Sequence, residues 1–233
     1  MKTTIIGTGN VGTRFAEIFG DTPISPRTLE GLPTDSELYI IAVSDNAVKE
    51  VADKLPELDG IVVHTTGSVP MEALAHVRCA GYGVLYPFQT LSSSRSLPPD
   101  RIPLLLEASD SETLEKIRNA AIDAGFTHIG IADSDKRRKV HLTGTFACNF
   151  SNAMIAVSQQ ILDECGIDRD IITPLVEETM AKLKVLPAKE AQTGPAVRKD
   201  TATLSSHLSL LDELGMNKEA DIYNTISDYI MSR

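Results

Sequence analysis

The stretch that decides the fold is M-K-T-T-I-I-G-T-G-N-V-G, residues 1–12. Residues 1–6 predict a short buried strand, and T-R-F-A-E-I-F-G at 13–20 predicts a helix closed by a glycine. A G-x-G-x-x-G turn between strand and helix is typical of a dinucleotide-binding unit, with the pyrophosphate at the helix N-terminus. The alternative is a glycine-rich turn without a ligand. The predicted cofactor-binding residues of the turn are Gly7, Thr8, Gly9, Asn10, Val11 and Gly12.

Length and composition restrict the class of protein. The 233 residues allow one or two domains, and 42% hydrophobic with 23% charged residues is ordinary for a soluble globular protein. A net charge of −10 argues against a nucleic-acid partner. There is no apolar run of the roughly 20 residues that span a bilayer, and a strand stands where a signal peptide would be. Three cysteines without C-x-x-C spacing indicate reduced thiols, so we expect a cytoplasmic protein.

Short apolar runs alternate with helical patterns through the first half of the chain. This alternation predicts an α/β fold with a doubly wound parallel sheet, a Rossmann domain over residues 1–133. In such sheets ligands lie beyond the carboxyl ends of the strands. The predicted strands after the first are residues 22–25, 38–43, 60–64, 82–85, 102–106 and 127–131, with a helix over 112–124.

The segment after the second predicted strand bears on the choice of cofactor. It offers Ser25, Arg27 and Thr28, and no carboxylate before Glu30. An acidic residue at this place would bond the ribose of NAD, whereas an arginine can pair with the 2′-phosphate of NADP. We therefore expect NADP(H) in preference to NAD(H), with these three residues as ligands. The alternative is a solvated loop arginine.

Other strand ends supply further candidates. Val43 and Ser44 follow one strand, and Thr66 and Gly67 follow the next, so all four are predicted to contact the cofactor. His64 and Gln89 are candidate substrate-binding residues. Alternatively, His64 is a hydrogen-bonded structural residue, and Gln89 is a turn residue after Pro87. The non-periodic segment 90–101 is either a mobile flap beside the site or an exposed connection.

The pattern becomes helical near residue 134, which predicts an all-α second domain over residues 134–233. Its first helix is expected to begin with Ser134 or Asp135 as N-cap, to run to about Cys165, and to stop at Gly166. Further helices are predicted over 168–186, 196–214 and 217–232.

Polar residues at helical spacing mark one face of the first of these helices: His141, Thr145, Asn149 and Asn152. Such a stripe is either a satisfied hydrogen-bond network or a substrate-facing wall. We expect His141 and Asn149 to be catalytic and the other two to bind substrate. No Cys, Asp or Glu completes a metal-ligand set on this face, so no metal is expected.

The stretch T-G-P-A-V-R-K-D at 193–200 holds the last candidates. Arg198 is predicted to bind a substrate carboxylate, for which the guanidinium fork is suited, and Asp200 to bind substrate beside it. The alternative for Arg198 is a surface ion pair with Asp200 or with an acidic residue elsewhere.

Together these motifs resemble bacterial Rossmann-like proteins with a helical C-terminal domain of unknown function, labelled NADP oxidoreductases of the deazaflavin-dependent type. The resemblance covers nearly the whole chain and includes H-T-T-G-S at 64–68, Y-P-F-Q-T at 86–90 and H-L-T-G-T-F-A-C-N-F-S-N at 141–152. More distantly, the chain looks like pyrroline-5-carboxylate reductase and the 3-hydroxyacid dehydrogenases.

These relatives imply NAD(P)-linked hydride transfer and a homodimer built through the helical domains. For the substrate we expect a small polar, carboxylated molecule. The hydroxyacid dehydrogenases carry a lysine one turn before the helix asparagine, but here Thr145 precedes Asn149. The missing lysine keeps a second hypothesis open, that of an NADP(H)-binding sensor or partner protein without turnover.

Overall fold

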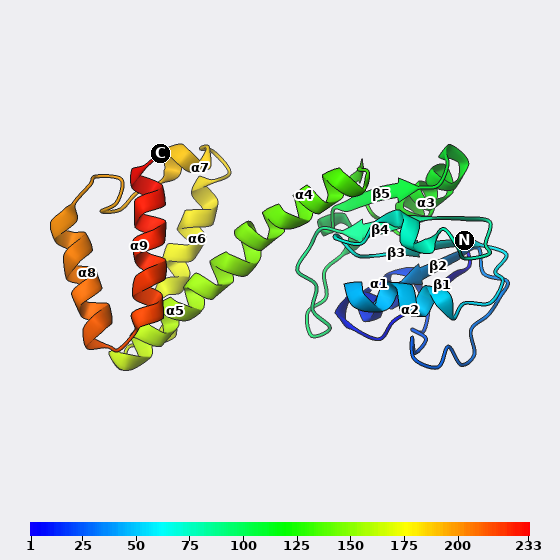
Figure 1. Cartoon of the computed structure of the whole chain (residues 1–233), viewed down its shortest axis with the longest axis horizontal. Helices are drawn as coiled ribbons and strands as arrows, with labels where there is room; N and C mark the ends of the chain where they lie inside the picture. The colour runs from blue at the N-terminus through cyan, green and yellow to red at the C-terminus, as the bar shows by residue number, and fades with distance from the viewer. The chain divides into compact units, whose positions relative to one another are not determined.

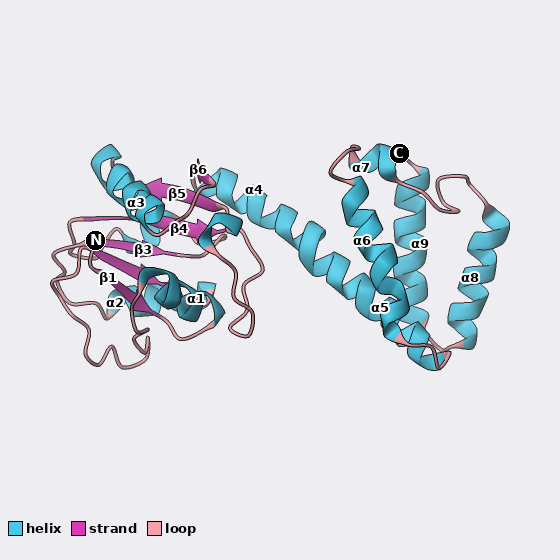
Figure 2. Ribbon diagram, turned by 180° about the vertical axis from the view of Figure 1, so that it is seen from behind, coloured by secondary structure: helices cyan, strands magenta, loops and turns pink.

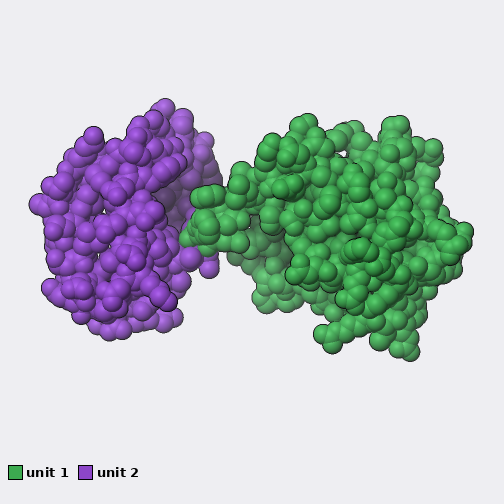
Figure 3. Space-filling view, in the orientation of Figure 1, with its two compact units in different colours: residues 1–150 green, residues 151–233 purple.

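The computed structural model describes residues 1–233, which divide into two compact units, residues 1–150 and 151–233 (Figure 3). The division falls later than the predicted domain boundary at 133/134, because the first turns of the helical region pack against the sheet.

The first unit is built on one six-stranded sheet with strands in the order of the sequence (Figure 1). The sheet is mostly parallel, which agrees with the predicted doubly wound parallel fold, and one pair of strands, β4 and β5, is antiparallel. The connection from β4 to β5 contains only the short η3 (Pro99–Arg101). The strands are β1 (Thr3–Ile6), β2 (Leu38–Ile41), β3 (Ile61–His64), β4 (Gly81–Pro87), β5 (Leu104–Ala108) and β6 (Ile129–Ile131).

The predicted strand at residues 22–25 is reduced to a single bridge from Ile24 to Ile6 of β1. The amide of Gly7 donates to the carbonyl oxygen of Ile24 at 2.9 Å. Pro23 and Pro26 flank the bridge, and a proline has no N–H to extend a ladder. The bridge lies on the opposite side of β1 from β2, so the direction of winding reverses at β1. In open α/β sheets, ligands bind at such a reversal point.

Helices cover both faces of the sheet (Figure 2). On one face Ile5 and Ile40 pack with α1 (Asn10–Phe19) and α3 (Ser111–Asp123). On the other face the next residues along the strands, Ile6 and Ile41, pack with α2 (Val48–Asp53), which follows η1 (Asp45–Ala47), and with η2 (Met71–Leu74). All four isoleucines are fully buried, as expected for strands covered on both sides.

The predicted helix over residues 134–165 is helical throughout, but a π-helical segment interrupts it. Its N-cap is Asp133, which accepts from the amide of Lys136 at 2.8 Å, rather than Ser134 or Asp135. Gly166 ends it with φ +64°, as predicted. The helical elements are α4 (Ser134–Gly144), η4 (Thr145–Phe150, the π-helix), α5 (Ser151–Glu164), η5 (Arg169–Ile172), α6 (Thr173–Lys182), α7 (Ala188–Ala191), α8 (Thr201–Glu213) and α9 (Asn217–Met231).

The second unit buries few of its own apolar side chains. Between residues 151 and 233 the buried hydrophobic residues are Ala196, Leu204, Leu211 and Met216. By contrast, Leu175 is 68% exposed and Val185 is 79% exposed. The helices of this unit therefore carry apolar surface beyond what they bury among themselves. No helix of the chain has the length and hydropathy that a membrane crossing requires.

Candidate functional site

The glycines of the turn after β1 divide into two that are tightly packed and one that is open. Gly7 has φ +139°, and a Cβ there would lie 2.1 Å from the carbonyl oxygen of Ala42. A Cβ on Gly12 would lie 1.9 Å from the carbonyl oxygen of Gly7. A Cβ on Gly9 would meet no atom within 4 Å. Gly7 and Gly12 are thus required by the fold, whereas Gly9 leaves backbone accessible to a ligand.

The N-terminus of α1 begins at this open glycine. Gly9 is the N-cap, no side chain caps the helix, and the first turn carries no acidic residue. The first amides of a helix have no partner within it, and the helix dipole places partial positive charge there. An anion such as a pyrophosphate fits this arrangement.

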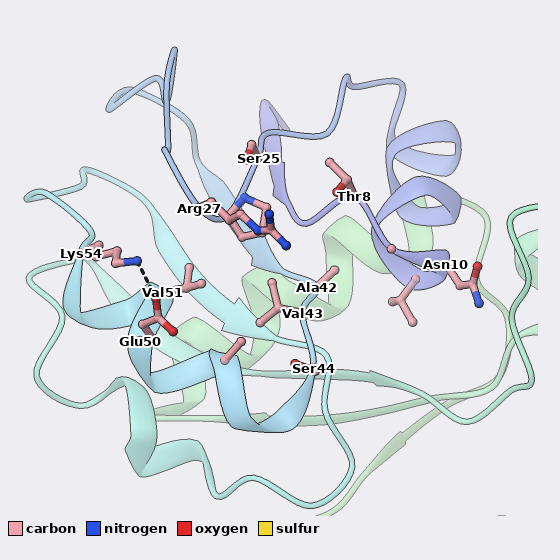
Figure 4. Close-up of a pocket in the computed structure, with 14 residues that line it drawn as sticks. Thr8, Asn10, Ser25, Arg27, Ala42, Val43, Ser44, Glu50, Val51 and Lys54 are labelled. Carbon is pink, nitrogen blue, oxygen red and sulfur yellow. Dashed lines mark hydrogen bonds and ion pairs between the residues drawn. The ribbon is translucent and has the colours of Figure 1, made fainter.

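A cleft of about 880 Å³ lies next to this helix end, and we call it the glycine-turn cleft (Figure 4). Its walls come from the glycine turn, the loop after Ile24, the end of β2, and η1 and α2. The volume suits a ligand of dinucleotide size, part of which would remain in solvent. The lining residues are Thr8, Gly9, Asn10, Val11, Ser25, Pro26, Arg27, Ala42, Val43, Ser44, Ala47, Glu50, Val51 and Lys54.

A second cleft, of about 280 Å³, lies beyond the end of β4, and we call it the His141 cleft. In it the hydroxyl oxygen of Tyr86 lies 3.0 Å from Nδ1 of His141, and the two rings meet edge to face. Burial raises the pKa of Tyr86, so its hydroxyl keeps its proton. The lining residues are Tyr86, Phe88, Gln89, Thr90, His141, Gly144, Thr145, Ala147, Cys148 and Asn149.

Gly67 makes room for the Tyr86–His141 pair. A Cβ on Gly67 would lie 2.5 Å from Nδ1 of His141 and 2.9 Å from Cζ of Tyr86. The segment that carries Gly67 therefore contacts both members of the pair, and any side chain there would displace them.

A buried ion pair fixes the start of α4, one turn before His141. The guanidinium of Arg137 is fully buried and pairs with Glu107 of β5. It also donates to the carbonyl oxygen of Val69 at 2.6 Å, which joins α4 to the segment after β3. Because residues i and i+4 share a helix face, this anchor positions His141 directly.

His64 lies at the end of β3 with no exposed surface. Its Nδ1 accepts from the amide of Thr66 at 3.2 Å, and the Thr66 hydroxyl lies at the same distance. Burial, with the charge of Arg137 adding to it, lowers the pKa of His64 to about 4. The ring is therefore neutral at physiological pH, and it offers no surface to a substrate in this structure.

The two clefts are linked through neighbouring residues. Ser44 lines the glycine-turn cleft, and the next residue, Asp45, accepts a hydrogen bond from the hydroxyl of Ser68. Ser68 follows Gly67, which contacts His141. A short path along the carboxyl ends of β2 and β3 thus joins the two clefts within the first unit.

The serine-rich segment between β4 and β5 is tied to α1. Arg14 is 3% exposed, and it donates to the carbonyl oxygen of Arg95 at 2.7 Å and to the hydroxyl of Ser96 at 2.8 Å. Asn10 accepts from the amide of Ser93 at 3.1 Å. Of the two interpretations of residues 90–101, these contacts favour an anchored connection over a free flap.

Most predicted cofactor residues converge on the glycine-turn cleft. Thr28 is exposed and does not line it, Gly7 and Gly12 pack behind it, and Thr66 and Gly67 belong to the surroundings of His64 and His141. The predicted residues that line this cleft are Thr8, Gly9, Asn10, Val11, Ser25, Arg27, Val43 and Ser44.

Only some of the predicted catalytic and substrate-binding residues lie together in one cleft. Thr145, Asn149 and Gln89 line the His141 cleft with His141. Gln89 already donates to the carbonyl oxygen of Arg101 at 3.0 Å and accepts from the amide of Thr90 at 2.9 Å, so its amide holds the turn. Asn152 is exposed on α5 and does not line this cleft. The π-helix adds a residue to the turn and breaks the predicted stripe.

Arg198 and Asp200 both lie in the second unit. Asp200 is the N-cap of α8 and accepts from the amide of Thr203 at 3.1 Å and from its hydroxyl at 2.7 Å. These hydrogen bonds, with the charge of Arg198 adding to them, lower the pKa of Asp200. Arg198 is exposed. Arg198 acts on Asp200 through its charge, and both the surface pair and the carboxylate clamp stay predictions.

Tyr86 and Lys54 are two residues of these clefts that the sequence interpretation missed. Tyr86 stands in the quoted Y-P-F-Q-T motif at the end of a strand, so its position was a usable signal. Lys54 reads as an ordinary helix residue paired with Glu50, and no local pattern shows that it reaches a cleft.

Comparison with known structures supports the resemblance inferred from the motifs. Protein BF3122 from Bacteroides fragilis, provisionally described as an NADP oxidoreductase, is 29% identical, with a TM-score of 0.88 over 99% of this chain and 98% of that chain. Two pyrroline carboxylate reductases share the fold. The Streptococcus pyogenes enzyme is 15% identical, with a TM-score of 0.58 over 100% of this chain and 99% of that chain. The Plasmodium falciparum enzyme, solved with NADP bound, is 9% identical, with a TM-score of 0.61 over 99% and 98%.

The sequence comparisons give a family. No match was found among curated proteins. Residues 102–230 match the family model described as a domain of unknown function, DUF2520. That stretch is more than half of the 233 residues, and the chain therefore belongs to the DUF2520 family.

Proposed function

We propose that this protein is an NADP-dependent oxidoreductase that transfers a hydride between the nicotinamide cofactor and a small polar, carboxylated substrate. The observation that carries the proposal is the uncapped N-terminus of α1 at the glycine-turn cleft, linked through Asp45 and Ser68 to the Tyr86–His141 pair. The similarity to BF3122 over nearly the whole chain supports the same reaction class.

The residues present fit a dinucleotide. The free amides at the start of α1 would bind the pyrophosphate, and the open backbone at Gly9 allows its close approach. Ser25 and Arg27 would bind the ribose end, where the guanidinium suits a 2′-phosphate. When bound, the nicotinamide would supply or accept the hydride, and the protein contributes orientation and charge.

His141 would hold and move the proton at Nε2. Its Nδ1 is engaged by the Tyr86 hydroxyl, which can donate to a neutral ring or accept from a protonated one. Tyr86 therefore orients the ring in both states while its own raised pKa keeps it protonated. Asn149, on the wall of the same cleft, would orient the substrate. Arg198 is proposed as the ligand of a substrate carboxylate.

The test is an NADPH oxidation screen over 2-keto, 3-keto and imino acids with wild type and His141→Ala. Loss of a general acid typically costs about a hundredfold or more in rate, so we expect a drop of that order. Gln192→Ala, at an exposed residue of the second unit, is the control. Turnover that persists unchanged in His141→Ala would remove this residue from the mechanism.

The second candidate is an NADP(H)-binding sensor or partner protein without turnover. It is favoured by Thr145 at the position where related dehydrogenases carry a lysine. Calorimetry beside the screen separates the two functions, because the sensor binds NADPH tightly and turns over none of the substrates.

We further propose a homodimer built through the helical unit. The exposed apolar side chains of that unit, such as Leu175 and Val185, support it, because large apolar surfaces usually meet a partner. Light scattering after size-exclusion chromatography should give twice the chain mass for wild type and for the control Glu177→Gln. Leu175→Asp should give monomer, and a wild-type monomer at micromolar concentration would contradict the proposal.

A further inference from the structure

The glycine-turn cleft contains three charged side chains, and they converge from two different elements. Arg27 comes from the loop after the Ile24 bridge, whereas Glu50 and Lys54 come from α2 and its C-terminal end (Figure 4). The other lining residues are neutral, so the lining carries a net charge of about +1 by side-chain count on a chain of net charge −10. The cleft is thus locally suited to an anion.

Lys54 is held by Glu50 rather than free. Its Nζ lies 2.7 Å from Oε1 of Glu50, and this contact lowers the pKa of Glu50. Both side chains reach solvent, with Lys54 43% and Glu50 69% exposed. Exposed ion pairs between residues four positions apart on a helix contribute little to stability. Lys54 can therefore exchange Glu50 for another anion at a small cost in free energy.

We propose that Lys54 is a second cation for the 2′-phosphate of NADP, acting with Arg27, and that Glu50 holds Lys54 while the nucleotide is absent. This inference rests on the proposed function. A phosphate monoester carries a charge of about −1.5 to −2 near neutral pH, more than one arginine neutralises. When NADP binds, Lys54 exchanges its contact with Glu50 for a contact with the 2′-phosphate. NAD lacks this phosphate, so Lys54 does not increase the affinity for NAD.

A different role for Glu50 makes an opposite prediction. An acidic residue at the ribose can accept from the 2′-hydroxyl of NAD and favour that cofactor. The ion pair with Lys54 argues against this role, because Lys54 already occupies the carboxylate. The variant Glu50→Gln distinguishes these two roles of Glu50, because only the role at the ribose predicts weaker binding of NADH.

The chain provides a matched control on the same helix. Lys49 pairs with Asp53 at 2.9 Å with the same spacing of four residues, but neither of these two residues lines the cleft. Lys49→Gln therefore removes an equal charge and an exposed ion pair of the same spacing without touching the cleft, and Asp53 keeps its contact with His76.

The experiment measures the Kd of NADPH and NADH by calorimetry for wild type, Lys54→Gln, Lys49→Gln and Glu50→Gln. Because a charge-assisted contact to phosphate is lost, Lys54→Gln should weaken NADPH binding about tenfold and change NADH binding less than about twofold. Lys49→Gln should resemble wild type, and Glu50→Gln should bind NADPH as tightly or more tightly. The pair 2′,5′-ADP and 5′-AMP, which differ only in the 2′-phosphate, should repeat the selective effect.

Two results would overturn the inference while leaving the proposed function intact. One is an NADPH affinity in Lys54→Gln equal to that in Lys49→Gln, and the other is a loss of NADH affinity in Glu50→Gln. A wild-type protein that binds neither dinucleotide would overturn the proposed function as well.

Discussion

The hydroxyl oxygen of Tyr86 lies 3.0 Å from Nδ1 of His141, although the two residues are 55 positions apart in the chain. The contact joins the end of a sheet strand to the first helix after the sheet, across a gap that only a glycine at position 67 leaves open. A hydrogen-bonding hydroxyl with a raised pKa thus fixes the one imidazole that lines this cleft.

Tyr86→Phe should lower kcat about fivefold without changing the Kd of NADPH, because a single neutral hydrogen bond contributes about 1 kcal/mol. Because the hydroxyl of Tyr86 contacts His141, the proposed proton donor, the pH profile of kcat should also shift in this variant. Steady-state kinetics between pH 5 and 9 measure both effects. Tyr82→Phe, at a tyrosine outside both clefts, is the control, and an unchanged pH profile in Tyr86→Phe would contradict the coupling.

Two glycines of the turn, Gly9 and Gly12, should respond differently to substitution by alanine. Gly12→Ala is expected to lose about 3 kcal/mol of unfolding free energy, because its Cβ would overlap the carbonyl oxygen of Gly7. Gly9→Ala should change stability by less than about 0.5 kcal/mol, since its Cβ meets open space. Gly9→Ala should nevertheless weaken NADPH binding. Urea unfolding and calorimetry on the same samples test both statements, and normal binding by Gly9→Ala would contradict the pyrophosphate assignment.

Breaking the Arg137–Glu107 pair should cost about 3–5 kcal/mol in either single variant, Arg137→Met or Glu107→Leu, because each leaves a charge without its buried partner. The double variant should recover part of that loss. The control is Lys139→Met, which removes an exposed pair with Asp135 on the same helix and should have little effect. Urea unfolding measures the free energy of unfolding of the two single variants, the double variant and the control. A double variant as unstable as the sum of the singles would argue against direct coupling.

Stability should fall in mild acid because of His64. Its pKa is about 4 in the folded chain against an ordinary value of 6.5, so the unfolded chain takes up the proton first. The stabilisation is complete above pH 6.5 and is lost as the pH falls toward 4. Between pH 7.5 and pH 5 this group alone should remove about 2 kcal/mol of unfolding free energy.

His64→Gln cannot titrate, so the same change of pH should cost this variant about 2 kcal/mol less than it costs wild type. Urea unfolding of both proteins at the two pH values measures the difference. His76→Gln, at a histidine 46% exposed in its side chain, is the control and should keep the wild-type dependence. Equal losses in wild type and His64→Gln would show that other groups govern the acid transition.

The amino-acid sequence by itself determined the elements whose cause is local. The strand, glycine turn and helix of residues 1–20 follow from apolar spacing and from glycines that the backbone requires. The stop at Gly166 follows in the same way from a backbone with φ +64°. Most of the predicted cofactor residues lie in one cleft because parallel strands bring their carboxyl ends to one edge.

Tertiary structure alone decided the features that depend on packing between distant segments. The antiparallel direction of the β4–β5 pair has no counterpart in the local sequence pattern, and the π-helix shifts the polar stripe out of its 3.6-residue period. His64 looked like a substrate ligand, but the packing around it removes its exposed surface and its charge. Tyr86 meets His141, and Lys54 reaches the cleft beside Arg27, because the fold joins surfaces that no local pattern records.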